Sequence, residues 1–184
     1  FKRISGFHNS AFAFWNPGVY HYQKTRVEAL LNHDKNLRRT TPTTIFPTTA
    51  CNFRNVCCYK HRDMLNCPFG WCAITALGNF DHTLGGHLIL WELKLIMEFP
   101  HCYTIFIPSA TITHSNIPVA SGDVRVSITQ YCAGSIFRYV DNGFRTDKAL
   151  EKEDNKMHKK LKEMKGKAWE RSLNLLSKLE DILR

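Results

Sequence analysis

The sequence predicts an α+β protein whose centre is a mainly β domain of the jelly-roll kind, with helices on either side of it in the chain. Three observations predict this class: short β-type runs between residues 50 and 140, turn residues that separate them, and a Lys-, Glu- and Leu-rich composition after residue 147. Many short strands at such spacing are typical of sandwiches and barrels. The expected parts are a helical and loop segment over residues 1–45, a β core over 46–147 and a long C-terminal helix over 148–184.

Composition limits the classes of protein that remain. Hydrophobic residues make up 43% of the 184 residues and aromatic residues 12%, which excludes a disordered chain. We expect no membrane span, because no apolar run reaches the roughly 18 residues that one requires, and no signal peptide is visible. A net charge of +9 is compatible with a polyanionic partner such as nucleic acid. The seven irregularly spaced cysteines are expected to be reduced, as in an intracellular compartment.

Residues 1–50 carry few signals of regular structure. We expect one short helix, Val27–Asn32, because its apolar residues share a helical face. Pro42 and Pro47 argue against a helix over Arg38–Thr49, so this stretch is interpreted as a loop that enters the main domain.

The β core is predicted from runs of β-branched, aromatic and aliphatic residues bounded by Gly, Pro, Asn and Ser. In the run Val124–Tyr131, polar and apolar residues alternate, so Arg125, Ser127 and Thr129 share one face. If that face lines a cavity, Arg125 points into it. The predicted strands are Val56–Tyr59, Cys72–Leu77, His87–Leu90, Leu93–Phe99, Tyr103–Ile107 and Val124–Tyr131.

The C-terminal segment, residues 148–184, contains no Pro and only Gly166 as a weak helix former. Its leucines and other apolar residues follow a helical stripe, which predicts a long amphipathic helix or a helix pair. We expect its apolar side to dock on the core or on a partner protein. Binding of DNA through its lysines is the alternative.

His61 and Asp63, followed much later by His114, have the sequence form of a 2-His-1-carboxylate facial triad. Three such ligands on one face of an octahedron leave sites open for a chelating 2-oxo acid and O2. In a jelly roll, strands that are distant in sequence adjoin in space, so these three residues could meet. The spacing therefore suggests catalytic metal ligands of an Fe(II)- and 2-oxoglutarate-dependent dioxygenase.

Two further residues suit the co-substrate in this interpretation. Arg125 offers a planar fork for the distal carboxylate of 2-oxoglutarate, and Ser127 could add a hydroxyl to the same carboxylate. The alternatives are a surface cluster around His61 and Asp63, a hydrogen-bonded core His114 and a salt-bridged Arg125. A zinc site is a further alternative, with four candidate ligands: Cys57, Cys58, Cys67 and Cys72. The Cys-x2-Cys spacing of common structural zinc sites is absent, so most of these cysteines are better interpreted as small buried core residues.

Over roughly residues 45–147, the sequence resembles the TET/JBP family of dioxygenases, and within it the fungal branch associated with transposable elements. The resemblance begins at His61-Arg62-Asp63 with Asn66. It continues, in the same order along the chain, through residues 70–81, 85–88, 107–109, 114–118 and 137–144. Residues 52–55 and 101–102 depart from the pattern of the family.

The resemblance implies a double-stranded β-helix in which His61, Asp63 and His114 bind Fe(II) and Arg125 binds 2-oxoglutarate. It implies oxidation of 5-methylcytosine in DNA to 5-hydroxymethylcytosine, and on to more oxidised forms, with O2 consumed and the base flipped out of the duplex. A nuclear location follows from such a substrate. Asn66 is a candidate for contacting the flipped base, and fixing a turn is its alternative role.

Two other functions stay open at this point. One is oxidative demethylation of N6-methyladenine or of an RNA base, which no residue excludes. The other is a non-catalytic module that binds nucleic acid or a partner protein, as expected of a degenerate copy that departs from its family.

Overall fold

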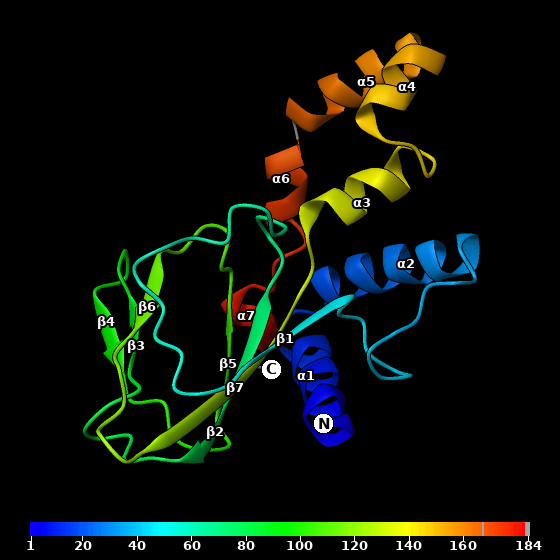
Figure 1. Cartoon of the computed structure of the whole chain (residues 1–184). Helices are drawn as coiled ribbons and strands as arrows, with labels where there is room; N and C mark the ends of the chain where they lie inside the picture. The colour runs from blue at the N-terminus through cyan, green and yellow to red at the C-terminus, as the bar shows by residue number, and fades with distance from the viewer. Residues whose placement is uncertain (167, 183–184) are drawn as a thin grey trace. The chain divides into compact units, whose positions relative to one another are not determined.

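The computed structural model describes residues 1–166 and 168–182. Residues 167, 183 and 184, which belong to the predicted C-terminal helix, lie outside the described residues. The chain divides into two compact units (Figure 1): one comprises Phe1–Ile45 with Ala133–Arg184, and the other is Phe46–Cys132. Within the described part, no helix has both the length and the apolar character needed to cross a membrane.

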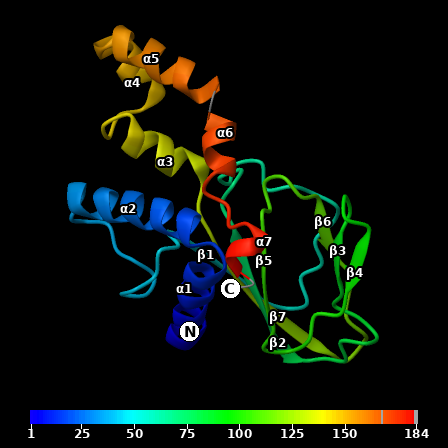
Figure 2. The same cartoon turned by 180° about the vertical axis from the view of Figure 1, so that it is seen from behind.

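The second unit is built from two antiparallel sheets, which both views show side by side (Figures 1 and 2). The first sheet has the order β1-β7-β2-β5, and these strands are Thr48–Asn52, Val124–Tyr131, Cys72–Asn79 and Thr104–Ile107. The second has the order β4-β3-β6, formed by Leu95–Met97, Leu88–Leu90 and His114–Asn116.

The order of the strands identifies the fold as the expected jelly roll. The chain passes from β1 and β2 in the first sheet to β3 and β4 in the second, then to β5, to β6 and back to β7. Non-consecutive strands are therefore neighbours, as in a double-stranded β-helix. An isolated antiparallel bridge between His61 and His114 adds the chain around His61 to the second sheet. The mainly β core with flanking helices agrees with the prediction.

The core of this unit lies among the inward-facing apolar side chains of both sheets. Cys72 and Ala76 of β2 contribute from one sheet, and Leu88 and Leu90 of β3 from the other. Phe99 completes the cluster together with Ile107. Burial of each larger side chain contributes about 1.5–3 kcal/mol, so the cluster holds the sheets that carry the candidate ligands.

The first strand differs from the prediction. Val56–Tyr59, predicted as a strand, has no strand assignment, whereas β1 begins at Thr48 within the predicted loop. β1 pairs along its whole length with β7, from Thr48 opposite Tyr131 to Asn52 opposite Ser127. Around residue 58 the N–H groups are instead satisfied by a side chain, since the N–H of Cys58 donates to Asn116 Oδ1 at 2.7 Å.

The other unit is helical, and its N-terminal part contains more helix than was predicted. α1 spans Lys2–Trp15 and α2 spans Pro17–His33, where only Val27–Asn32 was expected. The side chain of Asn16 caps α2 by accepting the N–H of Val19, and Pro17 occupies its first turn. The hydrophobic period of α1 is weak because its buried face is mostly polar, formed by Ser5, His8, Asn9 and Phe12.

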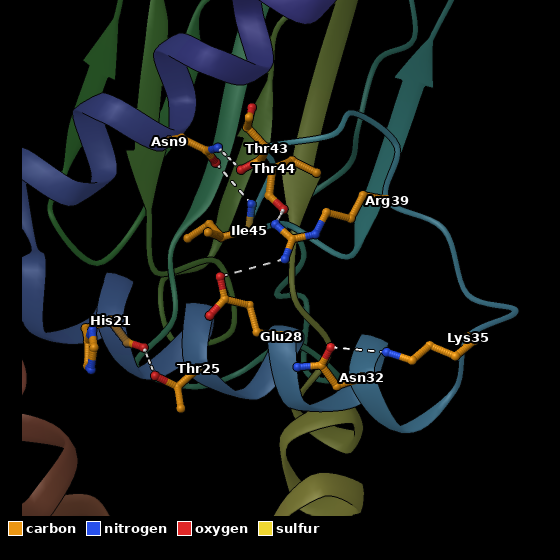
Figure 3. A network of polar contacts seen from close by, with 10 residues as sticks. All are labelled: Asn9, His21, Thr25, Glu28, Asn32, Lys35, Arg39, Thr43, Thr44 and Ile45. Atoms are coloured by element: carbon orange, nitrogen blue, oxygen red, sulfur yellow. Dashed lines mark hydrogen bonds and ion pairs between the residues drawn. The ribbon is translucent and has the colours of Figure 1, made fainter.

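Polar contacts explain this buried face (Figure 3). Asn9 donates to the carbonyl of Thr43 and accepts the N–H of Ile45 at 3.2 Å, so its amide fixes the segment after α2. Arg39 donates to the carbonyl of Thr44 at 3.0 Å and lies 3.9 Å from Glu28. Side-chain hydrogen bonds, which leave no apolar pattern in the sequence, therefore hold α1 and α2 to the loop.

The C-terminal segment is helical, as predicted, but it is divided. After α3, Gly134–Asp141, the described helices are α4, Asp147–Glu153, α5, Asn155–Gly166, α6, Ala168–Leu173, and α7, Leu179–Ile182. A long helix or a helix pair was expected, and the first interruption is at Asp154, which is the C-cap of α4. The Asp154 carboxylate also accepts the N–H of Met157 at 2.9 Å, so the same residue starts α5.

Candidate metal centre

The predicted ligands His61, Asp63 and His114 converge. One possible ligand atom from each residue lies within 4.8 Å of the other two. The two imidazole centroids are 4.4 Å apart, and His61 Nε2 is 3.6 Å from an Asp63 carboxylate oxygen. Among the described residues, this is the one group of three or more His, Cys, Asp or Glu that could hold a metal ion. The four cysteines that were candidate zinc ligands therefore do not form a metal-binding group.

The main chain brings these residues together. The N–H of His61 donates to the carbonyl of His114 at 3.1 Å, and the N–H of His114 donates to the carbonyl of His61 at 2.9 Å. His114 opens β6, which pairs with β3, so the bridge fixes His61 against a sheet. The N–H of Asp63 donates to the carbonyl of Ser109 at 2.9 Å. The ligands are therefore held by backbone pairing on two sides.

Both histidines are fixed in the same tautomer. Nδ1 of His61 lies 2.7 Å from the carbonyl oxygen of Tyr59, and Nδ1 of His114 lies 3.0 Å from that of Ile112. A carbonyl oxygen only accepts, so each Nδ1 carries the proton that it donates. Each Nε2 of the neutral ring is then a lone-pair donor for a metal, which is the outer-shell arrangement typical of metal-binding histidines.

Asn66 and Ser109 orient the carboxylate of Asp63. The Asn66 amide donates to the second carboxylate oxygen at 3.3 Å and to the hydroxyl of Ser109 at 3.1 Å. The N–H of Asn66 also donates to the carbonyl of Asp63 at 2.8 Å, which closes a turn. These bonds give Asn66 the turn role that was its alternative. Its contact with a flipped base stays a prediction.

Arg125 is a buried cation that forms no ion pair with an acidic residue of the described part of the chain. Only 6% of this residue is exposed, and its Nε has no hydrogen-bond partner among the described residues. The guanidinium carbon lies 5.9 Å from the ring centroid of Phe80 and 5.6 Å from that of Phe99. A buried charge that is not paired is costly, so such a site favours an incoming anion.

The surroundings hold the Arg125 side chain in place. Gly86 has a φ of +74°, and a Cβ built there would lie 3.2 Å from Arg125 Cδ and 3.1 Å from a ring carbon of Phe80. The Arg125 side chain therefore packs against the backbone of Gly86, where there is no side chain. Burial lowers the pKa of Arg125 from its ordinary value, while the nearby thiols of Cys58 and Cys57 raise it. An arginine stays protonated despite such a shift.

Residues 55–58 connect the strand of Arg125 with the strand of His114. Asn55 Oδ1 accepts the N–H of Arg125 at 2.5 Å, and its own N–H donates to the Arg125 carbonyl at 3.1 Å. At the other end, the side chain and the N–H of Asn116 bond to the main chain of Cys58. The Cys58 pKa is raised by burial first and then by Cys57 and Asp63, whereas Arg125 lowers it. The main chain and side chains of residues 55–58 thus bond to both β7 and β6.

Ser127 lies two residues after Arg125 on β7 and is likewise buried, with 6% of the residue exposed. Its hydroxyl accepts a hydrogen bond from the Asn52 amide at 3.1 Å. The hydroxyl is therefore already engaged by β1. Its contribution to binding of 2-oxoglutarate stays a prediction.

The residues present fit a divalent iron ion. Two neutral imidazoles and one carboxylate would leave a bound Fe(II) with one net positive charge and open coordination positions, as in the facial-triad enzymes. The side chains of His61 and Asp63 are 41% and 33% exposed, whereas His114 is buried. An ion held here would therefore be reachable from solvent on one side.

Four supporting residues were not assigned a role from the sequence: Asn55, Gly86, Ser109 and Asn116. Asn116 follows His114 by two residues on a strand, a spacing that could have indicated a common face. Gly86 could have been suspected as a site of close backbone approach within Gly85-Gly86. Asn55 and Ser109 form hydrogen bonds with residues that are distant in sequence, and no local pattern indicates such partners.

No protein-family model matches the chain, and no curated protein matches it. Among solved structures, the chain is similar to NgTET1 in complex with 5mC DNA, with a TM-score of 0.45 and 18% identity over 57% of this chain and 42% of that one. It is also similar to a viral collagen prolyl hydroxylase from Paramecium Bursaria Chlorella virus-1 in a 2OG complex, with a TM-score of 0.35 and 18% identity over 62% and 71% of the two chains. An RmlC-like cupin protein from Desulfovibrio desulfuricans has a TM-score of 0.30 and 10% identity over 51% and 94%. This chain thus spans less than half the length of NgTET1.

Proposed function

We propose that this chain is an Fe(II)- and 2-oxoglutarate-dependent dioxygenase that oxidises 5-methylcytosine in DNA to 5-hydroxymethylcytosine and on to more oxidised forms. The observation that carries the proposal is the convergence of His61, Asp63 and His114, with each imidazole presenting Nε2. The ordinary structural alternative for such a cluster, an ion pair on the surface, does not account for two rings held in the same tautomer.

Each ligand has a defined task in this proposal. His61 and His114 would donate neutral nitrogens, and Asp63, held by Asn66, would donate one carboxylate oxygen. Fe(II), when bound, supplies activation of O2, with 2-oxoglutarate as the co-reductant that leaves as succinate and CO2. The protein's part is to keep coordination positions open and to orient the two reactants beside them.

The co-substrate is proposed because of Arg125. Its buried Nε has no hydrogen-bond partner among the described residues, and residues 55–58 bond both to the strand of Arg125 and to the strand of His114. A dicarboxylic acid could place one end on the guanidinium and the other on the metal. A charge-assisted, two-pronged contact with arginine would then fix its orientation.

The substrate class is proposed from the motif resemblance to the TET/JBP family and from the net charge of +9. His61 and Asp63 are partly exposed, so an extruded base could approach them, whereas a base stacked in a duplex could not. The fungal, transposon-associated branch and a nuclear location belong to the same proposal.

The test is turnover with defined oligonucleotides. The purified protein is incubated with Fe(II), 2-oxoglutarate and O2 together with DNA that contains 5-methylcytosine or N6-methyladenine, or with methylated RNA. Mass spectrometry is expected to find 5-hydroxymethylcytosine together with stoichiometric succinate, both lost in Asp63→Ala. Oxidation of adenine or RNA alone would overturn the substrate. Binding without turnover, unchanged by His61→Ala, would overturn the enzyme.

A further inference from the structure

The metal ligands lie in a segment that exposes several large apolar side chains. We call residues 53–65 the ligand-flanking segment. Tyr59 is 90% exposed, Leu65 86% and Met64 76%, and Phe53 at the other end of the segment is 62% exposed. Several exposed apolar side chains within one stretch indicate a surface that binds a partner, because apolar area left in water does not stabilise the fold.

The same segment carries positive charge. Arg54, Lys60 and Arg62 are exposed, and Asp63, a candidate metal ligand, is its one acidic residue. The Lys60 ammonium lies 4.2 Å from the centroid of the Trp91 ring, which is itself 42% exposed. The acidic residue Glu92 lies in the turn between β3 and β4, and hydrogen bonding with Thr113 first, and Arg62 to a lesser extent, lower the pKa of its carboxyl.

Trp91 extends this surface toward the third ligand. Its indole N–H donates to the hydroxyl of Ser115 at 3.1 Å, and Ser115 adjoins His114. Glu92 is engaged by Thr113, whose N–H donates to its carboxylate at 2.8 Å. Tyr59 and Lys60 thus precede the ligand His61, and Trp91, in contact with Lys60, bonds to the residue after the ligand His114. This combination suits a strand of nucleic acid, whose bases stack and whose phosphates pair, better than an apolar protein surface.

We propose that the ligand-flanking segment binds the DNA strand that carries the reacting base, with the Tyr59 ring stacked on a neighbouring base and Lys60 and Arg62 on phosphates. This inference rests on the proposed function and assigns the surface that holds its substrate. The main chain of Tyr59 already serves His61 through its carbonyl, which leaves the exposed ring available.

The position of Tyr59 in the chain suits a neighbouring base rather than the reacting one. Tyr59 is two residues from His61, and two residues of chain span at most about 7 Å. The reacting base must lie at the metal itself, and the Tyr59 ring is not a metal ligand. Tyr59 is therefore assigned as a positioning residue for the strand.

The experiment measures binding of a fluorescein-labelled single-stranded 12-mer by anisotropy, with Mn(II) present and 2-oxoglutarate and O2 absent. Stacking on an aromatic ring is worth about 1–3 kcal/mol per base, so Tyr59→Ala is expected to raise Kd about 5- to 150-fold, and Tyr59→Trp to restore it. The matched control is Tyr103→Ala, since Tyr103 is also exposed, at 63%, and lies just before β5.

Salt dependence tests the phosphate contacts. For a single strand, each lost contact lowers the slope of log K against log salt by about 0.7, so Lys60→Gln with Arg62→Gln should lower it by about 1.4. The corresponding control is Lys94→Gln, an exposed lysine in the turn before β4. An unchanged slope would overturn the assignment of phosphates to these two residues.

Other outcomes separate this inference from the proposed function. Equal Kd for Tyr59→Ala and wild type, or the same loss in Tyr103→Ala, would overturn the surface even if the enzyme turns over methylated DNA. Loss of strand binding in Tyr59→Ala without any oxidation by the wild type would support the surface and reject the enzyme. A preference for RNA of the same sequence would overturn the assignment to DNA. Circular dichroism and melting check that Tyr59→Ala is folded.

Discussion

The main chains of His61 and His114 exchange two hydrogen bonds, of 3.1 and 2.9 Å. Such an exchange is the closely spaced pair of an antiparallel ladder, so the two residues stand directly opposite one another. Pairing in the second sheet thereby holds the imidazoles of two residues that are far apart in sequence at a fixed distance. The candidate metal site depends on this bridge more than on any side-chain contact.

Replacement of Arg125 by Met is expected to separate function from stability. The change removes a buried, unpaired charge while keeping a similar volume, so the free energy of unfolding should stay the same or rise. Binding of 2-oxoglutarate should weaken about 10- to 150-fold, since hydrogen bonds to a charged group are worth about 1.5–3 kcal/mol. Urea unfolding and calorimetric titration with 2-oxoglutarate measure the two effects. Unchanged affinity would show that another residue holds the co-substrate.

Replacement of Gly86 by Ala should disturb the position of the same Arg125 side chain. The added Cβ would crowd Arg125 Cδ and the Phe80 ring, and the positive φ of +74° costs about 1–2 kcal/mol for any other residue. Gly122→Ala is the matched control, because its φ is +91° but nothing lies within 4 Å of the added Cβ. Both variants should lose similar backbone stability in urea, and only Gly86→Ala should also weaken binding of 2-oxoglutarate. Equal weakening in both would contradict the crowding.

Asn66 is expected to act on the metal through Asp63. Removal of an outer-shell partner typically lowers metal affinity 10- to 100-fold, so Asn66→Ala should do so without any substrate present. Ser109→Ala, which removes the second acceptor of the same amide, should give a smaller loss in the same direction. Calorimetry with Mn(II) measures both. Full metal affinity with impaired DNA oxidation in Asn66→Ala would instead favour the contact with the flipped base.

Cys72 should make the fold sensitive to alkali. Burial, and then Asp63, raise the pKa of this thiol from 9.0 to about 12, although a hydrogen bond with Ser109 lowers it. Below pH 9 the thiol is protonated in both states. Above pH 9 only the unfolded state ionises, so stability is lost by about 1.4 kcal/mol per pH unit up to about pH 12.

Urea unfolding of wild type and Cys72→Ala between pH 7 and 11 tests this statement. The variant should be less stable at pH 7, because it loses buried volume, but its stability should decline less steeply above pH 9. The difference between the two curves removes the contributions of the other thiols and of lysine and tyrosine. Parallel curves over that range would contradict a raised pKa for Cys72.

The fold class was predictable because its signals are local. The alternation in Val124–Tyr131 and the apolar runs around Cys72 and Leu88 predicted strands that the structure contains. α1 escaped prediction because hydrogen bonds from residues such as Asn9, rather than apolar contacts, hold its buried face. The break at Asp154 was missed because a single residue caps two helices within a composition typical of one helix. The N–H of Asp154 donates to the Leu150 carbonyl at the end of α4, and its carboxylate accepts the N–H of Met157 at the start of α5.

The candidate site was predictable only in part. The spacing of His61 and Asp63 and the position of Arg125 carry chemical meaning in the sequence, so these residues could be named. The contacts that fix the tautomers and hold the Asp63 carboxylate join residues two or three apart, but they depend on the local backbone conformation, which no residue pattern indicates. The close approach of Gly86 to Arg125 joins residues that are distant in sequence, and register across the sheets decides it. Only a structure shows these contacts.

Anaerobic calorimetric titration of the protein with Fe(II) tests the central claim most directly. The account predicts one ion bound per chain, with the affinity lost in His61→Ala, Asp63→Ala and His114→Ala while their circular dichroism stays that of the wild type. Retention of Fe(II) binding by all three variants, or its absence from the wild type, would contradict the claim that these side chains share one ion.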